Sequence, residues 1–269
     1  MFKGFFLPVL FIISLLLILI FMGGLVASIA ITSVEANIGE TESQEKRNQE
    51  ESLATQDEDD FELLLIGDSV ATGIGDESGG NLGERYVELA EQGTDSIEWK
   101  VVNLSLPGSQ SKNWIRLLEQ GIYRKALQSA DLIFLSIGGN NLKAIYKTES
   151  LAGLVEYKEE LNQYLSDLQI IMNSIEEWNP NAQVVFIGLY NPYGVSVGVE
   201  KIRLLHEWNN ESQLLVDDQL NWVYVPLYDL FKYHQEEYLF LDDIHPNKDG
   251  YDAIANRIYE VVGKKISGK

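Results

Sequence analysis

The apolar run Leu63–Ile66, which stops at Gly67-Asp68-Ser69, restricts the fold more than any other stretch of this chain. An apolar run of this length, bounded by glycine, is typical of a parallel strand that is buried on both faces of an α/β sheet. Loops at the carboxyl ends of such strands carry the chemistry of these folds. Gly, Asp and Ser are also ordinary turn residues, so the tripeptide alone makes Ser69 only a candidate nucleophile.

Strand and helix patterns alternate through the rest of the chain. Strands are predicted near 62–66, 98–104, 131–137, 183–189 and 222–226, and helices near 83–92, 111–129, 151–178, 200–219 and 247–265. This alternation predicts one domain over residues 61–269, with a mainly parallel five-stranded sheet between two helical layers. The fold class is therefore α/β, in three layers α/β/α.

The N-terminal segment differs in kind from the rest. No charged residue lies between Lys3 and Glu35, and residues 5–31 are almost wholly apolar. About 20 apolar residues span a bilayer as a helix, whereas a secretory signal has an apolar region of roughly 7–15 residues. We expect residues 1–32 to form a transmembrane signal anchor, with a cleaved signal peptide as the alternative. The domain would then lie outside the cell, held at the membrane or secreted.

Residues 33–60 are strongly acidic. They hold ten acids against Lys46 and Arg47, with few apolar residues to offset the entropy of ordering, so a disordered spacer is predicted. Residues 61–269 hold 31 acids and 17 bases, a net charge of −14. This balance excludes nucleic acid as a partner, because phosphate neutralisation needs clustered Lys and Arg. The chain has no cysteine, which excludes disulfides and thiolate metal sites.

A serine hydroxyl needs an adjacent base to act as a nucleophile. The chain has three histidines. His206 lies within a helical pattern and His234 lies in a polar segment, so neither is favoured. His245 follows Asp242 by three residues, a spacing at which one turn brings the carboxylate to one ring nitrogen and leaves the other for Ser69.

Four segments, in this order, resemble the sequence blocks of the SGNH hydrolases, the GDSL-type esterases and lipases. They are Gly67-Asp68-Ser69, a looser block with Asn103 and Gly108, Gly138-Gly139-Asn140, and Asp242-x-x-His245-Pro246. The resemblance covers roughly residues 61–266 and is closest to bacterial, surface-located, lysophospholipase-like members. It implies the flavodoxin-like fold of that family and a Ser69-His245-Asp242 triad. The Gly-x-Ser-x-Gly elbow of α/β-hydrolases is absent.

The resemblance also implies an oxyanion hole. It assigns the donors to the backbone N–H of Ser69, the N–H of Gly108 and the side-chain amide of Asn140, all groups that suit this role. The family usually has Gly-x-Asn-Asp in the third block, whereas this chain has Asn141 in the last position. Support of that loop by a carboxylate is therefore in question, although Asn141 can still accept a hydrogen bond.

We therefore expect a serine esterase that hydrolyses carboxylic esters through an acyl-enzyme without a cofactor. The substrate could be a short-chain ester, a lysophospholipid or an acetylated glycan, and the loop at 191–198 is expected to shape its pocket. A metal-dependent phosphoesterase is one alternative, built from Asp68, Asp242, Asp243 and His245, because oxygen-rich clusters suit hard cations. A non-catalytic cell-wall- or glycan-binding module is the other, and the change at Asn141 supports it.

Overall fold

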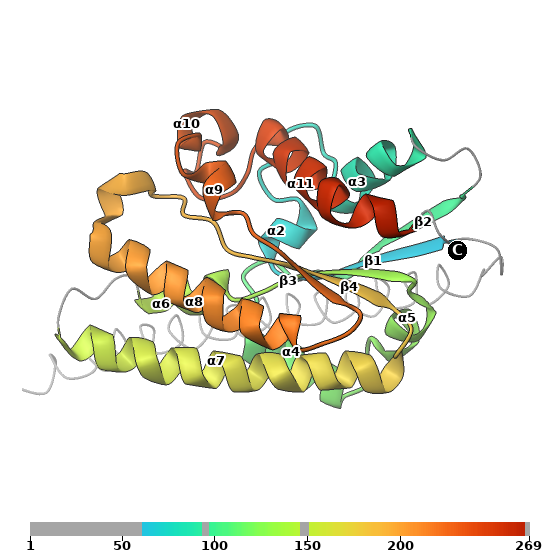
Figure 1. Cartoon of the computed structure of the whole chain (residues 1–269), viewed down its shortest axis with the longest axis horizontal. Coiled ribbons are helices and arrows are strands. Elements are labelled where there is room, and N and C mark those ends of the chain that lie inside the picture. Colours follow the sequence, from blue (N-terminus) through green and yellow to red (C-terminus); the bar gives the residue numbers. More distant parts are fainter. Residues whose placement is uncertain (1–60, 93–96, 146–150, 267–269) are drawn as a thin grey trace, which may run out of the picture. The chain divides into compact units, whose positions relative to one another are not determined.

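The computed structural model describes residues 61–92, 97–145 and 151–266 (Figure 1). The predicted membrane anchor and acidic spacer lie outside these residues, so both stay predictions. Among the described residues, no helix combines the length and the apolar character needed to cross a membrane.

Five parallel strands form the sheet, each close to a predicted position. They run in the order β2-β1-β3-β4-β5. Their bounds are β1 Phe61–Gly67, β2 Trp99–Asn103, β3 Leu132–Ser136, β4 Gln183–Ile187 and β5 Trp222–Val225. Strand β2 pairs on one side of β1 and β3 on the other, so the strand order reverses at β1. Open α/β folds bind ligands at the carboxyl edge of the sheet where such a reversal occurs. The predicted α/β class and parallel sheet are confirmed.

Helices cover both faces of the sheet, as the three-layer prediction requires (Figure 1). Helices α3 and α11 pack together on one face, and α4, α7 and α8 lie on the other. The longer helices are α3 Leu82–Glu91, α4 Ser111–Glu119, α7 Leu151–Trp178, α8 Val199–Asp217 and α11 Lys248–Ile266. The shorter ones are α2 Ser69–Thr72, α5 Arg124–Ser129, α6 Gly139–Ile145, η1 Gly194–Val197, α9 Tyr228–Phe231 and α10 Gln235–Tyr238.

The prediction of one helix over 111–129 was wrong. Helix α4 ends at Glu119 and α5 begins at Arg124, because Gly121 adopts a left-handed conformation (φ 67°) that a continuous helix cannot contain. The short helices α2 and α6 were not predicted as helices at all. Both begin directly after a strand, at the edge where the candidate site lies.

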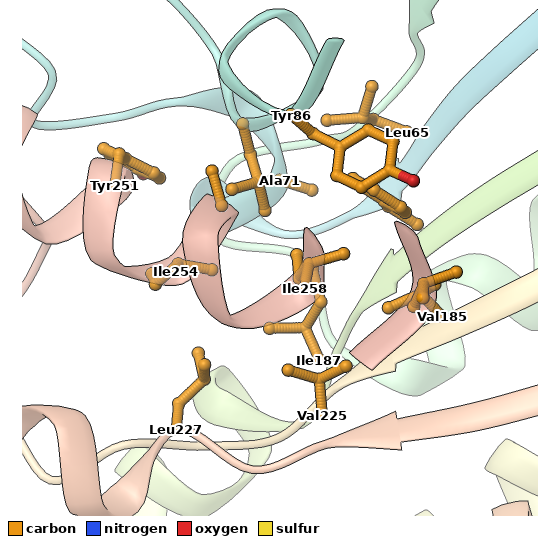
Figure 2. Packing of buried hydrophobic residues seen from close by; sticks show 14 of the residues in the cluster. Leu65, Ala71, Tyr86, Val185, Ile187, Val225, Leu227, Tyr251, Ile254 and Ile258 are labelled. Atoms are coloured by element: carbon orange, nitrogen blue, oxygen red, sulfur yellow. The ribbon is translucent and has the colours of Figure 1, made fainter. Parts of the chain in front are cut away.

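One cluster of the apolar core lies between the sheet and α11 (Figure 2). Figure 2 shows Ile254 and Ile258 of α11 facing side chains of β4 and β5, among them Ile187 and Val225. These residues are almost completely buried. The burial of this apolar surface fixes α11 against the sheet, and with it the loop that precedes α11 and carries His245.

Candidate active site

The structure brings Ser69, from the start of the domain's sequence, together with Asp242 and His245, from near its end. Ser69 is the first residue of α2, whereas Asp242 and His245 lie in the loop between α10 and α11. Ser69 Oγ lies 2.9 Å from His245 Nε2, and His245 Nδ1 lies 2.5 Å from Asp242 Oδ2. The three groups therefore form a continuous hydrogen-bonded chain.

The α10–α11 loop places Asp242, and not Asp243, against the imidazole. Asp242 Oδ1 accepts the backbone N–H groups of Ile244 (3.0 Å) and His245 (2.9 Å), which leaves Oδ2 for the ring. Asp243 turns the chain with a left-handed backbone (φ 57°), and its side chain is exposed. Partial burial raises the pKa of Asp242, but the hydrogen bonds from His245 and Ile244, together with the charge of His245, hold the pKa below its usual value.

Asp68 supports the turn from β1 into α2. Its Oδ1 atom accepts the Val70 N–H (3.1 Å) and the Ser136 hydroxyl (3.0 Å), so that it caps α2 and ties this helix to β3. The side chain is 3% exposed. Burial raises the pKa of its carboxyl to about 6, although both hydrogen bonds act in the opposite direction.

The structure places Asn140 in the lining of the pocket, whereas Gly108 is not among the lining residues. Asn140, in the first turn of α6, lines the same pocket as Ser69 and His245. Its Nδ2 atom donates to the Ser109 carbonyl (3.0 Å), and the second N–H of the amide can serve a ligand. Gly108 precedes Ser109 in a left-handed conformation (φ 76°) and is exposed, but it is not a lining residue of that pocket. The donor role of each stays a prediction.

A cavity of about 100 Å³ opens beside Ser69. Its walls are mainly apolar and come from the end of β4, from the segments that follow β1, β3, β4 and β5, and from the loop before α11. The side chains that form most of this wall are Val70, Leu142, Ile187, Leu189, Tyr190, Pro192, Tyr193, Leu227 and Ile244. The 191–198 loop contributes Pro192 and Tyr193, in agreement with the expectation that it shapes the pocket.

Sequence reasoning missed Tyr190. Its hydroxyl donates to the Ile244 carbonyl (2.6 Å), and its ring stacks on Phe231 at a centroid distance of 4.2 Å. Tyr190 therefore joins the pocket wall to the loop that carries His245. Its position three residues after the carboxyl end of β4 was the one available signal.

The residues of the metal hypothesis are engaged in other contacts. Asp68 accepts hydrogen bonds from Val70 and Ser136, while Asp242 is bonded to His245. Within residues 61–92, 97–145 and 151–266, no cluster of three or more His, Cys, Asp or Glu side chains could hold a metal ion. The hypothesis therefore has no ligand set in that part of the chain.

The other two histidines lie outside the cavity. His206 packs against Tyr228, with ring centroids 4.2 Å apart. His234 Nδ1 forms a hydrogen bond with Glu237 Oε2 (2.9 Å). Neither lines the pocket beside Ser69. This agrees with the expectation that His245 is the histidine that faces Ser69.

The chain matches the model of the GDSL-like lipase/acylhydrolase family over residues 65–253 and belongs to that family. The family match and the parallel α/β fold together make this protein a carboxylic ester hydrolase. The resemblance to the SGNH hydrolases is thereby confirmed.

Three similar proteins share 27% or less of their sequence with this chain. YpmR of Bacillus subtilis (strain 168) is 27% identical over 218 residues, which are 78% of this chain and 85% of YpmR. Among solved structures, the lipase Lip_vut3 from a goat rumen metagenome has a TM-score of 0.64 at 19% identity, over 75% of this chain and 97% of its own. Axe2, an acetylxylan esterase from Geobacillus stearothermophilus, has a TM-score of 0.57 at 18% identity, over 76% of this chain and 94% of its own. These structures show the same fold.

The raised pKa of Asp68 predicts a pH-dependent effect of Asp68→Asn on stability. The folded state disfavours the Asp68 carboxylate, so this cost is absent below the unfolded pKa near 3.8 and fully present above about 6. An asparagine keeps the acceptor oxygen but carries no charge. The variant should therefore gain roughly 1–3 kcal/mol in free energy of unfolding at pH 7.5 and little at pH 4.

Urea unfolding at both pH values measures this difference. Asp243→Asn, at an exposed position, serves as the control and should show no such trend. An equal gain from Asp68→Asn at pH 4 and pH 7.5 would contradict the assignment.

Proposed function

We propose that the enzyme hydrolyses carboxylic esters through an acyl-enzyme formed on Ser69. The observation that carries the proposal is the hydrogen-bonded chain Asp242–His245–Ser69 at an apolar cavity. A serine at 2.9 Å from an imidazole, which a carboxylate orients through its other nitrogen, is the arrangement that activates a hydroxyl.

Each group has a defined role in the proposed reaction. His245 Nε2 takes the proton of Ser69 Oγ as this oxygen attacks the ester carbonyl, and Asp242 stabilises the imidazolium that forms. The backbone N–H groups of Ser69 and Gly108 and the amide of Asn140 donate to the oxyanion. His245 then protonates the leaving alcohol, and a water molecule releases the acid by the same steps.

The cavity favours a short acyl group. Pockets for drug-sized ligands measure roughly 300–1,000 Å³, so about 100 Å³ is too little for a long chain buried whole. Axe2, whose fold is similar, is an acetylxylan esterase, and Lip_vut3 is a lipase. An acetylated glycan or another short-chain ester therefore has more support than a lysophospholipid.

A series of p-nitrophenyl esters tests the acyl preference. We expect kcat/KM to be greatest for acetate or butyrate and to fall at least tenfold for decanoate, because a chain longer than the cavity must displace its walls, at a cost of about 1–3 kcal/mol. Acetate release from acetylated xylan would then support a glycan substrate. A maximum at decanoate would contradict the preference and favour a lipid.

Covalent labelling tests the nucleophile. A fluorophosphonate should label the full-length protein once, and Ser69→Ala should abolish both labelling and esterase activity without loss of the fold. Chelator should have no effect on either. Ser105→Ala, in the loop after β2, is the control and should still be labelled. Labelling that persists in Ser69→Ala would place the nucleophile elsewhere, and an inactive, unlabelled wild type would favour a binding module.

Paired variants test the acid. Asp242→Asn should lower kcat severely, by up to about 10⁴ in well-studied triads, with little change in KM, because the ring loses its orienting carboxylate. Asp243→Asn should be mild, since its side chain is exposed and Asp242 already holds the ring. Steady-state kinetics of both variants give the comparison, and equal, modest losses would indicate a Ser69–His245 dyad.

A further inference from the structure

Asn141 stands at the position where the family pattern has aspartate, and its side chain is 3% exposed. Its Oδ1 atom accepts the backbone N–H of Ser111 (3.1 Å). Its Nδ2 atom donates to Glu160 Oε1 (2.7 Å) and to Ser111 Oγ (3.1 Å). The amide thus uses its acceptor and both donors, as a buried polar group requires.

These contacts join three helices. Asn141 lies in the first turn of α6, Ser111 begins α4, and Glu160 lies on α7. Ser111 Oγ donates in turn to Asp167 Oδ2 on α7 (2.7 Å), so its lone pairs are left to accept from Asn141. The Ser111 N–H belongs to the first turn of α4, which has no acceptor within its own helix. The Asn141 amide therefore accepts a hydrogen bond from α4 and donates one to α7.

Neighbouring hydrogen bonds hold Asn140 in place. Gln110 Nε2 donates to the Asn140 carbonyl (3.1 Å), and Asn140 Nδ2 donates to the Ser109 carbonyl (3.0 Å). With the bond between Ser111 and Asn141, these make three successive links between segments 109–111 and 140–141. A shift of Asn141 would shift the neighbouring Asn140 side chain, which lines the pocket beside Ser69.

We propose that Asn141 and Glu160 form a positioning pair that sets the oxyanion donor Asn140. Glu160 supplies from α7 a carboxylate that the family pattern carries at position 141 itself, and Asn141 has the donor that this carboxylate needs. The inference rests on the proposed role of Asn140 in ester hydrolysis.

An exchange of charge between the two positions tests the pair in the full-length enzyme. Asn141→Asp sets a second carboxylate against Glu160 and removes the donor, so kcat should fall about 10- to 100-fold at pH 7.5 with KM nearly unchanged. Glu160→Gln keeps an acceptor oxygen and should lower kcat no more than about threefold. The double variant restores one donor and one carboxylate, and should recover at least about tenfold over Asn141→Asp.

The pH profile separates positioning from a general structural loss. In Asn141→Asp the two carboxyls can share a proton at low pH, so its activity relative to wild type should rise from pH 8 to pH 5. The double variant should show no such rise. Glu159→Gln, an exposed neighbour on α7, is the matched control and should not rescue Asn141→Asp.

A second pair of variants applies if Asn141→Asp fails to fold. Glu160→Ala leaves the Asn141 amide without its acceptor and should lower kcat about tenfold, whereas Glu160→Gln should stay near wild type. Equal effects of these two variants, or additive effects of Asn141→Asp and Glu160→Gln, would overturn the inference.

Asn140→Ala distinguishes this inference from the proposed function. A loss of about 10²–10³ in kcat together with additive effects at 141 and 160 would overturn the positioning pair alone. An unchanged kcat in Asn140→Ala would remove the oxyanion role and, with it, the inference.

Discussion

The close approach between the end of β1 and the end of β3 is the constraint on which the site depends. A side chain on Gly67 would place its Cβ 1.9 Å from the Ser136 carbonyl oxygen, and the backbone of Gly67 has a φ of 127°. Only glycine meets both conditions. Because β1 can run this close to β3, the Asp68 N–H reaches the Ser136 carbonyl (2.8 Å), and α2 begins with Ser69 at the carboxyl edge of the sheet. The loop after β2 and helix α4 contact the same point, since Ser109 Oγ of the loop and Trp114 Nε1 of the helix both donate to the Gly67 carbonyl.

One group beside this point lowers the stability of the folded state. Asp68 is a buried carboxyl without a cationic side chain among its hydrogen-bond partners in the described part of the chain, and its raised pKa reflects the cost of that burial. Arg85 shows the contrast, because it pairs with the buried Asp76 and with Asp252, away from the pocket. Active sites often retain groups that lower stability, since the arrangement that serves the reaction differs from the most stable one.

The sequence predicts the parts of this molecule that follow from local pattern. The strands are mainly apolar segments, and Asp242 meets His245 because a single turn spans three residues. The helices α2 and α6 were missed because four and seven residues are too few to give a helical period, and tertiary contacts stabilise them instead. The contact of Tyr190 with Ile244 joins residues 54 apart, and Glu160 reaches Asn141 from a different helix. No local pattern predicts contacts of that kind.

The separation of Ser69 and His245 along the sequence has a consequence for the synthesis and folding of the chain. The two residues are 176 positions apart, and the strands and helices between them must be in place before the hydroxyl meets the ring. During synthesis, a nascent chain that ends before α10 already contains Ser69 but still lacks Asp242 and His245. The contact between Ser69 Oγ and His245 Nε2 is therefore a property of the completed fold and not of any shorter, partly made chain.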